Sequence, residues 1–170
     1  WMAAQAYHVT LPEALRSCVV FASPHSGRAY PAAFLRASVL DEHAIRSSED
    51  AFVDQLFAPA SEFGAAFLSA GAPRAFVDLN RAYDEMDPAL IVGVRRAGHN
   101  PRIALGLGVI PRVVANGRAI YRGKLSRSEA DARIATYWNP YHAKLQALLD
   151  AAHQRHGQAV LIDCHSMPRE

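Results

Sequence analysis

The sequence has little net charge, few cysteines and no long apolar run, and each of these shortages excludes a class of protein. The longest apolar stretches, residues 18–22 and 159–162, are far shorter than the roughly 20 residues that a membrane-spanning helix requires, and no secretory signal pattern opens the chain. The net charge is only +2, and the arginines are scattered instead of forming a basic stripe that could follow a phosphate backbone. We therefore expect a cytoplasmic protein that binds neither membranes nor nucleic acid.

Cysteine chemistry is equally limited. The two cysteines, Cys18 and Cys164, both lie inside apolar runs, where a thiol behaves as a small buried hydrophobic group. We expect both to be reduced and assign neither of them a catalytic role. Hydrophobic residues, in contrast, make up 51% of the 170 residues, which is enough to form the core of one domain.

Four short apolar runs predict the strands of a buried sheet. They are residues 18–23, 66–70, 74–79 and 159–164. The first and the last of these runs lead into polar residues and a proline. Because ligands of open α/β sheets usually bind beyond the carboxyl ends of the strands, this edge is the place to look for a site.

Two longer segments predict helices. Residues 48–63 carry apolar side chains at helical spacing, and Pro59 is expected to bend that helix. The stronger pattern covers residues 126–157: it opens with Ser126 in a capping-box arrangement, and Pro140 is expected to kink or divide it. The segment between glycines 93 and 123 is rich in glycine, proline and arginine, and its Asn-Gly pair at 116–117 predicts a hairpin between residues 109–114 and 119–121.

Two histidines follow predicted strands in the same way. His25 comes just after residues 18–23, and His165 comes just after residues 159–164. Both imidazoles are therefore expected at the carboxyl edge of the sheet. A catalytic zinc ion commonly takes two histidines and one carboxylate, and keeps a fourth position for water. A structural role for each histidine alone is as plausible as ligation, but the matching positions favour a metal site.

The carboxylate of this metal site is predicted to come from the start of the helix over residues 48–63. Asp50 is the first candidate, followed by Glu49 and then Asp54. Acids in the first turn of a helix also complement its dipole and bond its free amides, so the choice stays open. Asp163 is expected to accept the second ring N–H of a ligand histidine and fix its tautomer; its alternative role is to cap the strand end.

A second group of polar residues predicts an anion site. Arg74, Asn80 and Arg81 surround the end of the third predicted strand. The planar fork of arginine suits a carboxylate and keeps its charge at every relevant pH. A substrate carboxylate is therefore a natural target. The alternative is a structural network of ion pairs with neighbouring acids, for which the chain offers Asp78, Asp84, Glu85 and Asp87.

Six ordered segments together resemble one known family. They are Ser-Pro-His-Ser-Gly at 23–27, Ser-Glu-Asp-Ala-Phe-Val-Asp at 48–54, Pro-Arg-Ala-Phe-Val-Asp-Leu-Asn-Arg at 73–81, Ile-Tyr-Arg-Gly-Lys-Leu at 120–125, Pro-Tyr-His at 140–142 and Ile-Asp-Cys-His-Ser-Met-Pro at 162–168. Along nearly its whole length the chain resembles the N-formylglutamate amidohydrolases, or formylglutamate deformylases. That family resembles in turn the zinc carboxypeptidases and aspartoacylases.

The resemblance implies a fold and an activity. The implied fold is a three-layer α/β/α domain of the hydrolase and zinc carboxypeptidase type, with a mixed, mostly parallel central sheet. The implied activity is zinc-dependent hydrolysis of N-formyl-L-glutamate to formate and L-glutamate, a reaction of histidine degradation. The expected cofactor is one zinc ion, and the expected partner is a small dicarboxylate substrate.

The resemblance also implies roles for particular residues. His25 and His165 become metal ligands together with an acid from residues 49–54, for which Asp50 ranks first. Asn80 and Arg81 become the clamp for the substrate carboxylate, and Arg122 helps to close the site. Arg74 then faces the scissile carbonyl.

Relatives in the wider group use a glutamate well beyond the last metal ligand as the general base, whereas this chain stops at Glu170. We therefore expect residues 1–170 to form a single α/β domain that lacks its C-terminal part. Two other functions remain open at this point. One is an amidohydrolase acting on a different N-acyl amino acid, and the other is a truncated, non-catalytic module that binds a metal and an anion.

Overall fold

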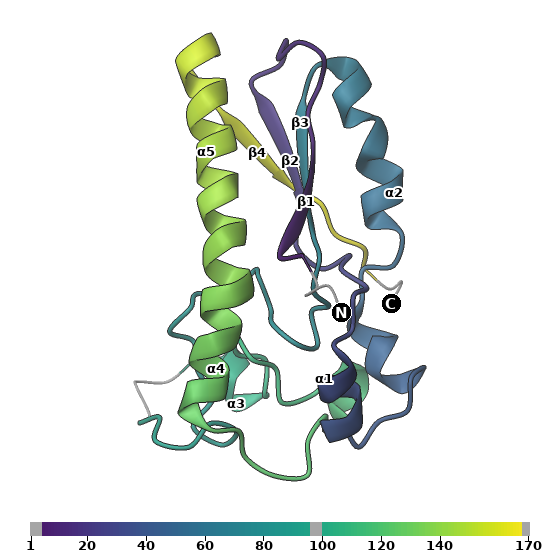
Figure 1. The fold of residues 1–170 in the computed structure, drawn as a ribbon, viewed down its shortest axis with the longest axis vertical. Coiled ribbons are helices and arrows are strands. Elements are labelled where there is room, and N and C mark those ends of the chain that lie inside the picture. Colours follow the sequence, from purple (N-terminus) through teal and green to yellow (C-terminus); the bar gives the residue numbers. More distant parts are fainter. Residues whose placement is uncertain (1–4, 96–99, 168–170) are drawn as a thin grey trace.

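The computed structural model describes residues 5–95 and 100–167, and its centre is a four-stranded mixed sheet (Figure 1). The strands are β1 (Tyr7–Thr10), β2 (Val19–Ser23), β3 (Ala66–Ala70) and β4 (Val160–Asp163), in the spatial order β1-β3-β2-β4. β2 runs parallel to both β3 and β4, while β1 runs antiparallel to β3 and β4 lies at an edge. The predicted mixed, mostly parallel sheet is confirmed.

The described residues form the helices α1 (Ala32–Ala37), α2 (Val53–Phe57), α3 (Pro101–Ala104), α4 (Arg127–Arg133) and α5 (Asn139–His156), with a π-helical turn over Ile134–Trp138 and 3-10 segments over Ala44–Ser48, Ala58–Phe63 and Ala115–Gly117. Figure 1 shows α5 along one face of the sheet and α2 along the other, which gives three layers. Within the described residues, none of the helices combines the length and the apolar character needed to cross a membrane.

The hydrophobic core divides between the two faces of the sheet. On the α5 side, Val20 and Leu68 belong to the main cluster together with Tyr141, Leu148 and Ala152, which lie along one side of α5. On the other side, a smaller cluster is built from Phe67 with Ala60 and Ala65, and Phe21 and Phe57 pack against it.

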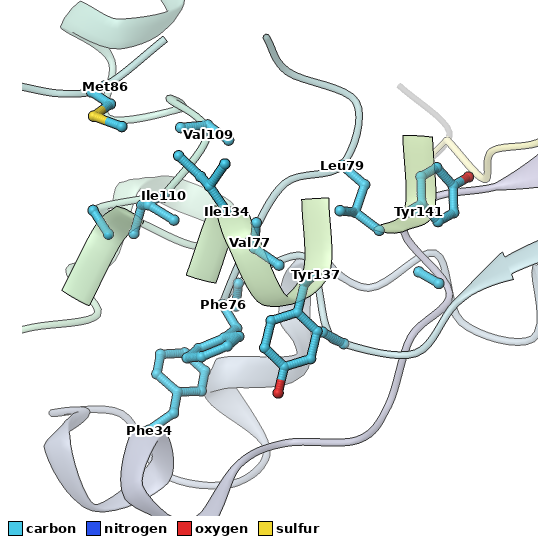
Figure 2. Close-up of a cluster of buried hydrophobic side chains, with 14 of the residues drawn as sticks. Phe34, Phe76, Val77, Leu79, Met86, Val109, Ile110, Ile134, Tyr137 and Tyr141 are labelled. Atoms are coloured by element: carbon cyan, nitrogen blue, oxygen red, sulfur yellow. The ribbon is translucent and has the colours of Figure 1, made fainter. Parts of the chain in front are cut away.

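The main cluster continues beyond the sheet into α1, the π-helical turn and the segments that connect them (Figure 2). There Phe34 and Phe76 face each other at 5.1 Å between ring centroids, and Tyr137 packs edge-on against Phe76 at 5.5 Å. Ile110 and Ile134 extend the same core. The loops that carry the polar residues therefore rest on a packed apolar base.

The prediction of a strand over residues 74–79 was wrong. The chain turns there, and the backbone N–H groups of Phe76 and Val77 both donate to the carbonyl of Pro73. The segment is apolar because it is buried, and a short buried run does not reveal whether it is extended or turned. The fourth strand is instead β1, a short strand that sequence patterning did not predict.

The single helix predicted over residues 48–63 was also wrong in part. The chain forms a 3-10 segment that ends at Ser48, an irregular stretch, the short helix α2 and a second 3-10 segment in which Pro59 occupies the first turn. Phe52 enters α2 with a left-handed backbone, at φ 65°, which is unusual for a bulky residue. The stop at Gly64, with φ 77°, follows the expected pattern.

The long helical segment agrees better with its prediction. Ser126 accepts a hydrogen bond from the Glu129 backbone N–H at the start of α4, and α5 ends at Gly157 with φ 73°. The expected interruption near Pro140 is the π-helical turn just before it. The predicted hairpin is reduced to one antiparallel bridge between Val113 and Ala119 around a left-handed Asn-Gly turn.

Candidate metal and anion site

His25 is held just beyond the end of β2. It is only 3% exposed, and its Nε2 lies 2.7 Å from Oδ1 of Asp78. A carboxylate bonded to one ring nitrogen fixes the tautomer, with the proton on Nε2 and the lone pair on Nδ1. That Nδ1 is buried and has no hydrogen-bond partner within residues 5–95 and 100–167. A buried, unpartnered imidazole lone pair is a donor available for a metal ion.

His165 lies beside His25 because β4 runs parallel to β2. Ala22 is paired with Asp163 in the sheet, so the chain leaves both strands at the same edge. The ring centroids of His25 and His165 are 4.8 Å apart. Nε2 of His165 lies 2.9 Å from Oδ2 of Asp163 and 3.2 Å from Nδ2 of Asn80. Asp163 therefore makes the contact that was predicted for it.

Asp50 completes the group. It is 6% exposed, its backbone N–H donates to the carbonyl of His25, and its Oδ2 lies 2.8 Å from Nδ1 of His165 and 3.6 Å from Nδ1 of His25. One donor atom from each of the three residues lies within 4.8 Å of the other two. Two imidazole nitrogens and one carboxylate oxygen form a set that suits a catalytic zinc ion.

The two other acids considered for this position are used elsewhere. Glu49 lies 3.4 Å from the guanidinium of Arg46, and Asp54 pairs with Arg28 at 2.5 Å. Glu49 directly follows the 3-10 segment that ends at Ser48, and Asp54 lies in the first turn of α2. Of the three candidates, the structure brings Asp50 to the histidine pair.

The contacts between these histidines and carboxylates shift the pKa values of His25, Asp50 and Asp78. Burial lowers the pKa of His25, but the nearby carboxylates of Asp50 and Asp78 outweigh burial, and the pKa is raised. Burial raises the pKa of Asp50, yet its contacts with the two histidines bring that pKa below its usual value. For Asp78, burial is likewise outweighed, chiefly by His25 and Arg74, and the pKa falls to about 2. Both carboxylates are therefore ionised at neutral pH.

Asp78 also organises the predicted anion site. Nε of Arg74 donates to its Oδ2 at 3.1 Å, and the backbone N–H of Asn80 donates to its Oδ1 at 2.9 Å. Nε of Arg81 lies 3.9 Å from the same carboxylate. Asp78 thus connects the histidine group to the residues predicted to bind the substrate carboxylate.

A cavity of about 720 Å³ opens at this edge of the sheet. Asp50, Arg74 and Asp78 line it on the polar side, while Leu107 and Val113 contribute to an apolar wall. Residues around the Asn116-Gly117 turn thus form part of the cavity wall. This volume is large enough for a small-molecule ligand.

Arg122, which was predicted to help close the site, is exposed, and no side-chain contact within residues 5–95 and 100–167 joins it to the histidines or to Asp78. Its neighbour Tyr121 accepts a hydrogen bond from the buried Arg133 at 2.7 Å, which gives that part of the motif a structural role.

Sequence reasoning missed two features of the site. Asp78 was considered only as a possible ion-pair partner for arginines, although it contacts His25 directly. Trp138 and His142 were given no role, yet each donates to a backbone carbonyl of the segment that holds Asn80. The order Asp-Leu-Asn-Arg could have suggested the first contact, but no spacing rule reveals the second.

The fold and the site together define an α/β protein with a histidine and carboxylate cluster beyond its parallel strands. A family model described as FGase, N-formylglutamate amidohydrolase, matches residues 17–170. The chain therefore belongs to the N-formylglutamate amidohydrolase family.

Individual relatives agree with this assignment. The chain is 26% identical over 151 residues to an N-formylglutamate deformylase of Pseudomonas putida, and 28% identical over 152 residues to one of Pseudomonas aeruginosa. Each match covers 88% of this chain but 51% and 52% of the relatives. The chain thus spans about half the length of these curated relatives.

Two solved structures share the fold of this chain. The crystal structure of N-formylglutamate amidohydrolase from Ralstonia eutropha matches with a TM-score of 0.89 and 36% identity, over 98% of this chain and 59% of that one. A gene product of Agrobacterium tumefaciens matches with a TM-score of 0.68 at 17% identity, over 98% of this chain and 58% of that one, which shows a shared fold.

Proposed function

We propose that this protein is a zinc-dependent amidohydrolase that cleaves N-formyl-L-glutamate into formate and L-glutamate. The family and the names of the Pseudomonas relatives support this substrate. The metal part of the proposal depends mainly on one observation, the buried and unpartnered Nδ1 of His25 beside Asp50 and His165. A role in histidine degradation follows from the same substrate and is part of the proposal.

His25, Asp50 and His165 would hold the zinc ion. Three protein ligands with nitrogen and oxygen donors leave one position open, as catalytic zinc sites require. When bound, zinc would polarise the formyl carbonyl and lower the pKa of water from about 15.7 toward about 7. Asp78 and Asp163 would keep the two imidazoles in the orientation that offers Nδ1 to the metal.

Arginine side chains would recognise and activate the substrate. Asp78 holds Nε of Arg74, and Arg74 lines the cavity, so its terminal nitrogens are available to stabilise negative charge on the formyl oxygen. Asn80 and Arg81 would bind a substrate carboxylate and orient a small molecule that offers little apolar surface. The assignment of Arg122 to the second carboxylate stays a prediction from the family resemblance.

The contacts of the three carboxylates in this site favour a second function, a module that binds zinc and a dicarboxylate without hydrolysing it. Asp50, Asp78 and Asp163 each contact an imidazole, so these three carboxylates are not placed to act as a general base. A module that binds zinc and a dicarboxylate without hydrolysing it would show the same contacts. Turnover by this chain separates the two functions.

The decisive experiment measures metal content and formate release on the same preparations. The wild-type chain is expected to bind one zinc ion by elemental analysis and to release formate from N-formyl-L-glutamate. His165→Ala is expected to lose both, while His153→Ala, on the exposed side of α5, is expected to retain both. Zinc binding without formate release would favour the binding module. An unchanged metal content in His165→Ala would contradict the metal site.

The acyl group is tested with matched substrates. N-formyl-, N-acetyl- and N-succinyl-glutamate differ only in the group that is released. The formyl compound is expected to be cleaved with the highest kcat/KM. A higher value for acetyl or succinyl would assign the chain to another N-acyl amino acid.

A further inference from the structure

Two aromatic side chains of the helical segment around Pro140 contact the turn that carries Asn80. Nε1 of Trp138 donates to the carbonyl of Arg81 at 2.8 Å, and Nε2 of His142 donates to the carbonyl of Leu79 at 2.9 Å. The two rings also pack on each other, with centroids 3.9 Å apart and planes inclined by 31°. The two packed rings therefore hold the backbone carbonyls of the two residues that flank Asn80.

The local helix geometry makes this double contact possible. Trp138 is the last residue of the π-helical turn, and His142 lies in the first turn of α5 after Pro140. Pro140 has no N–H for the usual helical bond, and a π turn widens the helix at such a place. The spacing of four residues then places the indole and the imidazole on the same side of the helix.

The turn that receives these bonds is fixed at three successive points. His142 holds the carbonyl of Leu79, Asp78 accepts the backbone N–H of Asn80, and Trp138 holds the carbonyl of Arg81. With the backbone held in this way, the amide of Asn80 reaches 3.2 Å from Nε2 of His165. The same turn sets the direction in which Arg81 leaves the backbone.

The protonation state of His142 suits this role. A carbonyl oxygen can only accept, so Nε2 of His142 must carry the proton. Burial lowers the pKa of His142, which keeps the imidazole neutral at physiological pH. A neutral imidazole therefore donates to the Leu79 carbonyl without adding a positive charge to this turn.

We propose that Trp138 and His142 are positioning residues that fix the turn over residues 79–81 so that Asn80 and Arg81 can bind the substrate carboxylate. This inference rests on the proposed function for the identity of the ligand. The contacts themselves do not depend on that function.

The test removes each donor while keeping the bulk of the side chain. Trp138→Phe keeps an aromatic ring without Nε1–H, and His142→Leu fills a similar volume without a donor. His142→Gln is the rescue variant because its amide can donate from nearly the position of Nε2. His153→Leu, an exposed position on the same helix, is the matched control.

Two readouts are measured on the zinc-loaded full chain. The first is hydrogen exchange by mass spectrometry of peptides covering residues 79–81. The second is the affinity for N-formyl-L-glutamate by calorimetry under conditions of slow turnover. Loss of one donor is expected to speed exchange in these peptides and to weaken binding by roughly three- to tenfold, the usual value of one hydrogen bond, with unchanged zinc content.

The outcomes separate this inference from the proposed function. Faster exchange confined to residues 79–81 in Trp138→Phe and His142→Leu, and its reversal in His142→Gln, supports the positioning role. Unchanged exchange in these peptides overturns it, as does an equal rise in exchange throughout the chain. If the wild type neither binds nor cleaves N-formyl-L-glutamate, the proposed function fails, and the exchange experiment still decides whether the turn is positioned by these two residues.

Discussion

His25 and Asp78 are 53 positions apart in the sequence, yet Nε2 of one lies 2.7 Å from Oδ1 of the other in the buried centre of the site. This contact links the two halves of the site. On one side, it leaves Nδ1 of His25 free to face Asp50 and His165. On the other, the same carboxylate holds Arg74 and the backbone of Asn80.

The first prediction concerns this pair. Asp78→Asn keeps the size of the side chain but removes the charge that orients His25, and the affinity for zinc is expected to fall roughly 10- to 100-fold. Competition with a chromophoric chelator measures the change. Asp54→Asn is the matched control because Asp54 pairs with Arg28 instead. Equal zinc affinity in the two variants would show that Asp78 does not support the metal site.

The second prediction concerns the choice of the third ligand. Asp50→Ala is expected to remove stoichiometric zinc, since it deletes the carboxylate that faces both imidazoles. Glu49→Gln is expected to retain it because Glu49 is directed toward Arg46. Elemental analysis of the two purified variants, with thermal unfolding to confirm that both are folded, gives the answer. Loss of zinc in Glu49→Gln alone would reverse the assignment.

The third prediction concerns pH. Burial lowers the pKa of His25, but Asp50 and Asp78 raise it more, so the metal-free protein keeps a proton on this imidazole to a higher pH than usual. Zinc binds the neutral imidazole and must displace that proton. Zinc affinity is therefore expected to fall as pH decreases, with proton release on binding. Titrations in two buffers with different ionisation enthalpies measure the release, and identical binding heats in both buffers would contradict it.

The fourth prediction concerns the cysteines. Both are free, as the sequence predicted; Cys164 is 3% exposed, whereas Cys18 is half-buried. Burial and the neighbouring Asp163 raise the pKa of Cys164 to about 11, so very little thiolate exists at pH 8. A chromogenic disulfide reagent at pH 8 is expected to modify Cys18 much faster than Cys164. Cys18→Ser should remove the fast phase and Cys164→Ser should preserve it; a fast phase that persists in Cys18→Ser would be inconsistent with this protection.

Much of the sheet edge could be predicted because strand ends are visible in a sequence. The runs before His25 and His165 are short, apolar and followed by polar turns, and parallel pairing then brings the two histidines together. The cap at Ser126 and the stop at Gly157 were similarly local features. Each of these depends on residues that are adjacent in the chain.

Features that depend on packing between distant segments could not be predicted in this way. Residues 74–79 have the composition of a strand but turn within the core, and the region before α2 departs from helix where Asp50 bonds the backbone of His25. The order of preference among Asp50, Glu49 and Asp54 came from position alone. In the structure, Asp50 contacts His165, while Glu49 lies beside Arg46 and Asp54 pairs with Arg28.

The edge position of β4 gives the candidate metal site a consequence for folding. Val160, Leu161 and Ile162 are each at least 40% exposed, so this strand has less cover than its neighbours and is a natural place for local opening. His165 follows β4 directly, whereas His25 follows the interior strand β2. A metal bound by both histidines would link the edge strand β4 to the interior strand β2. It would thereby bring a segment prone to fraying into the cooperative unfolding unit of the domain.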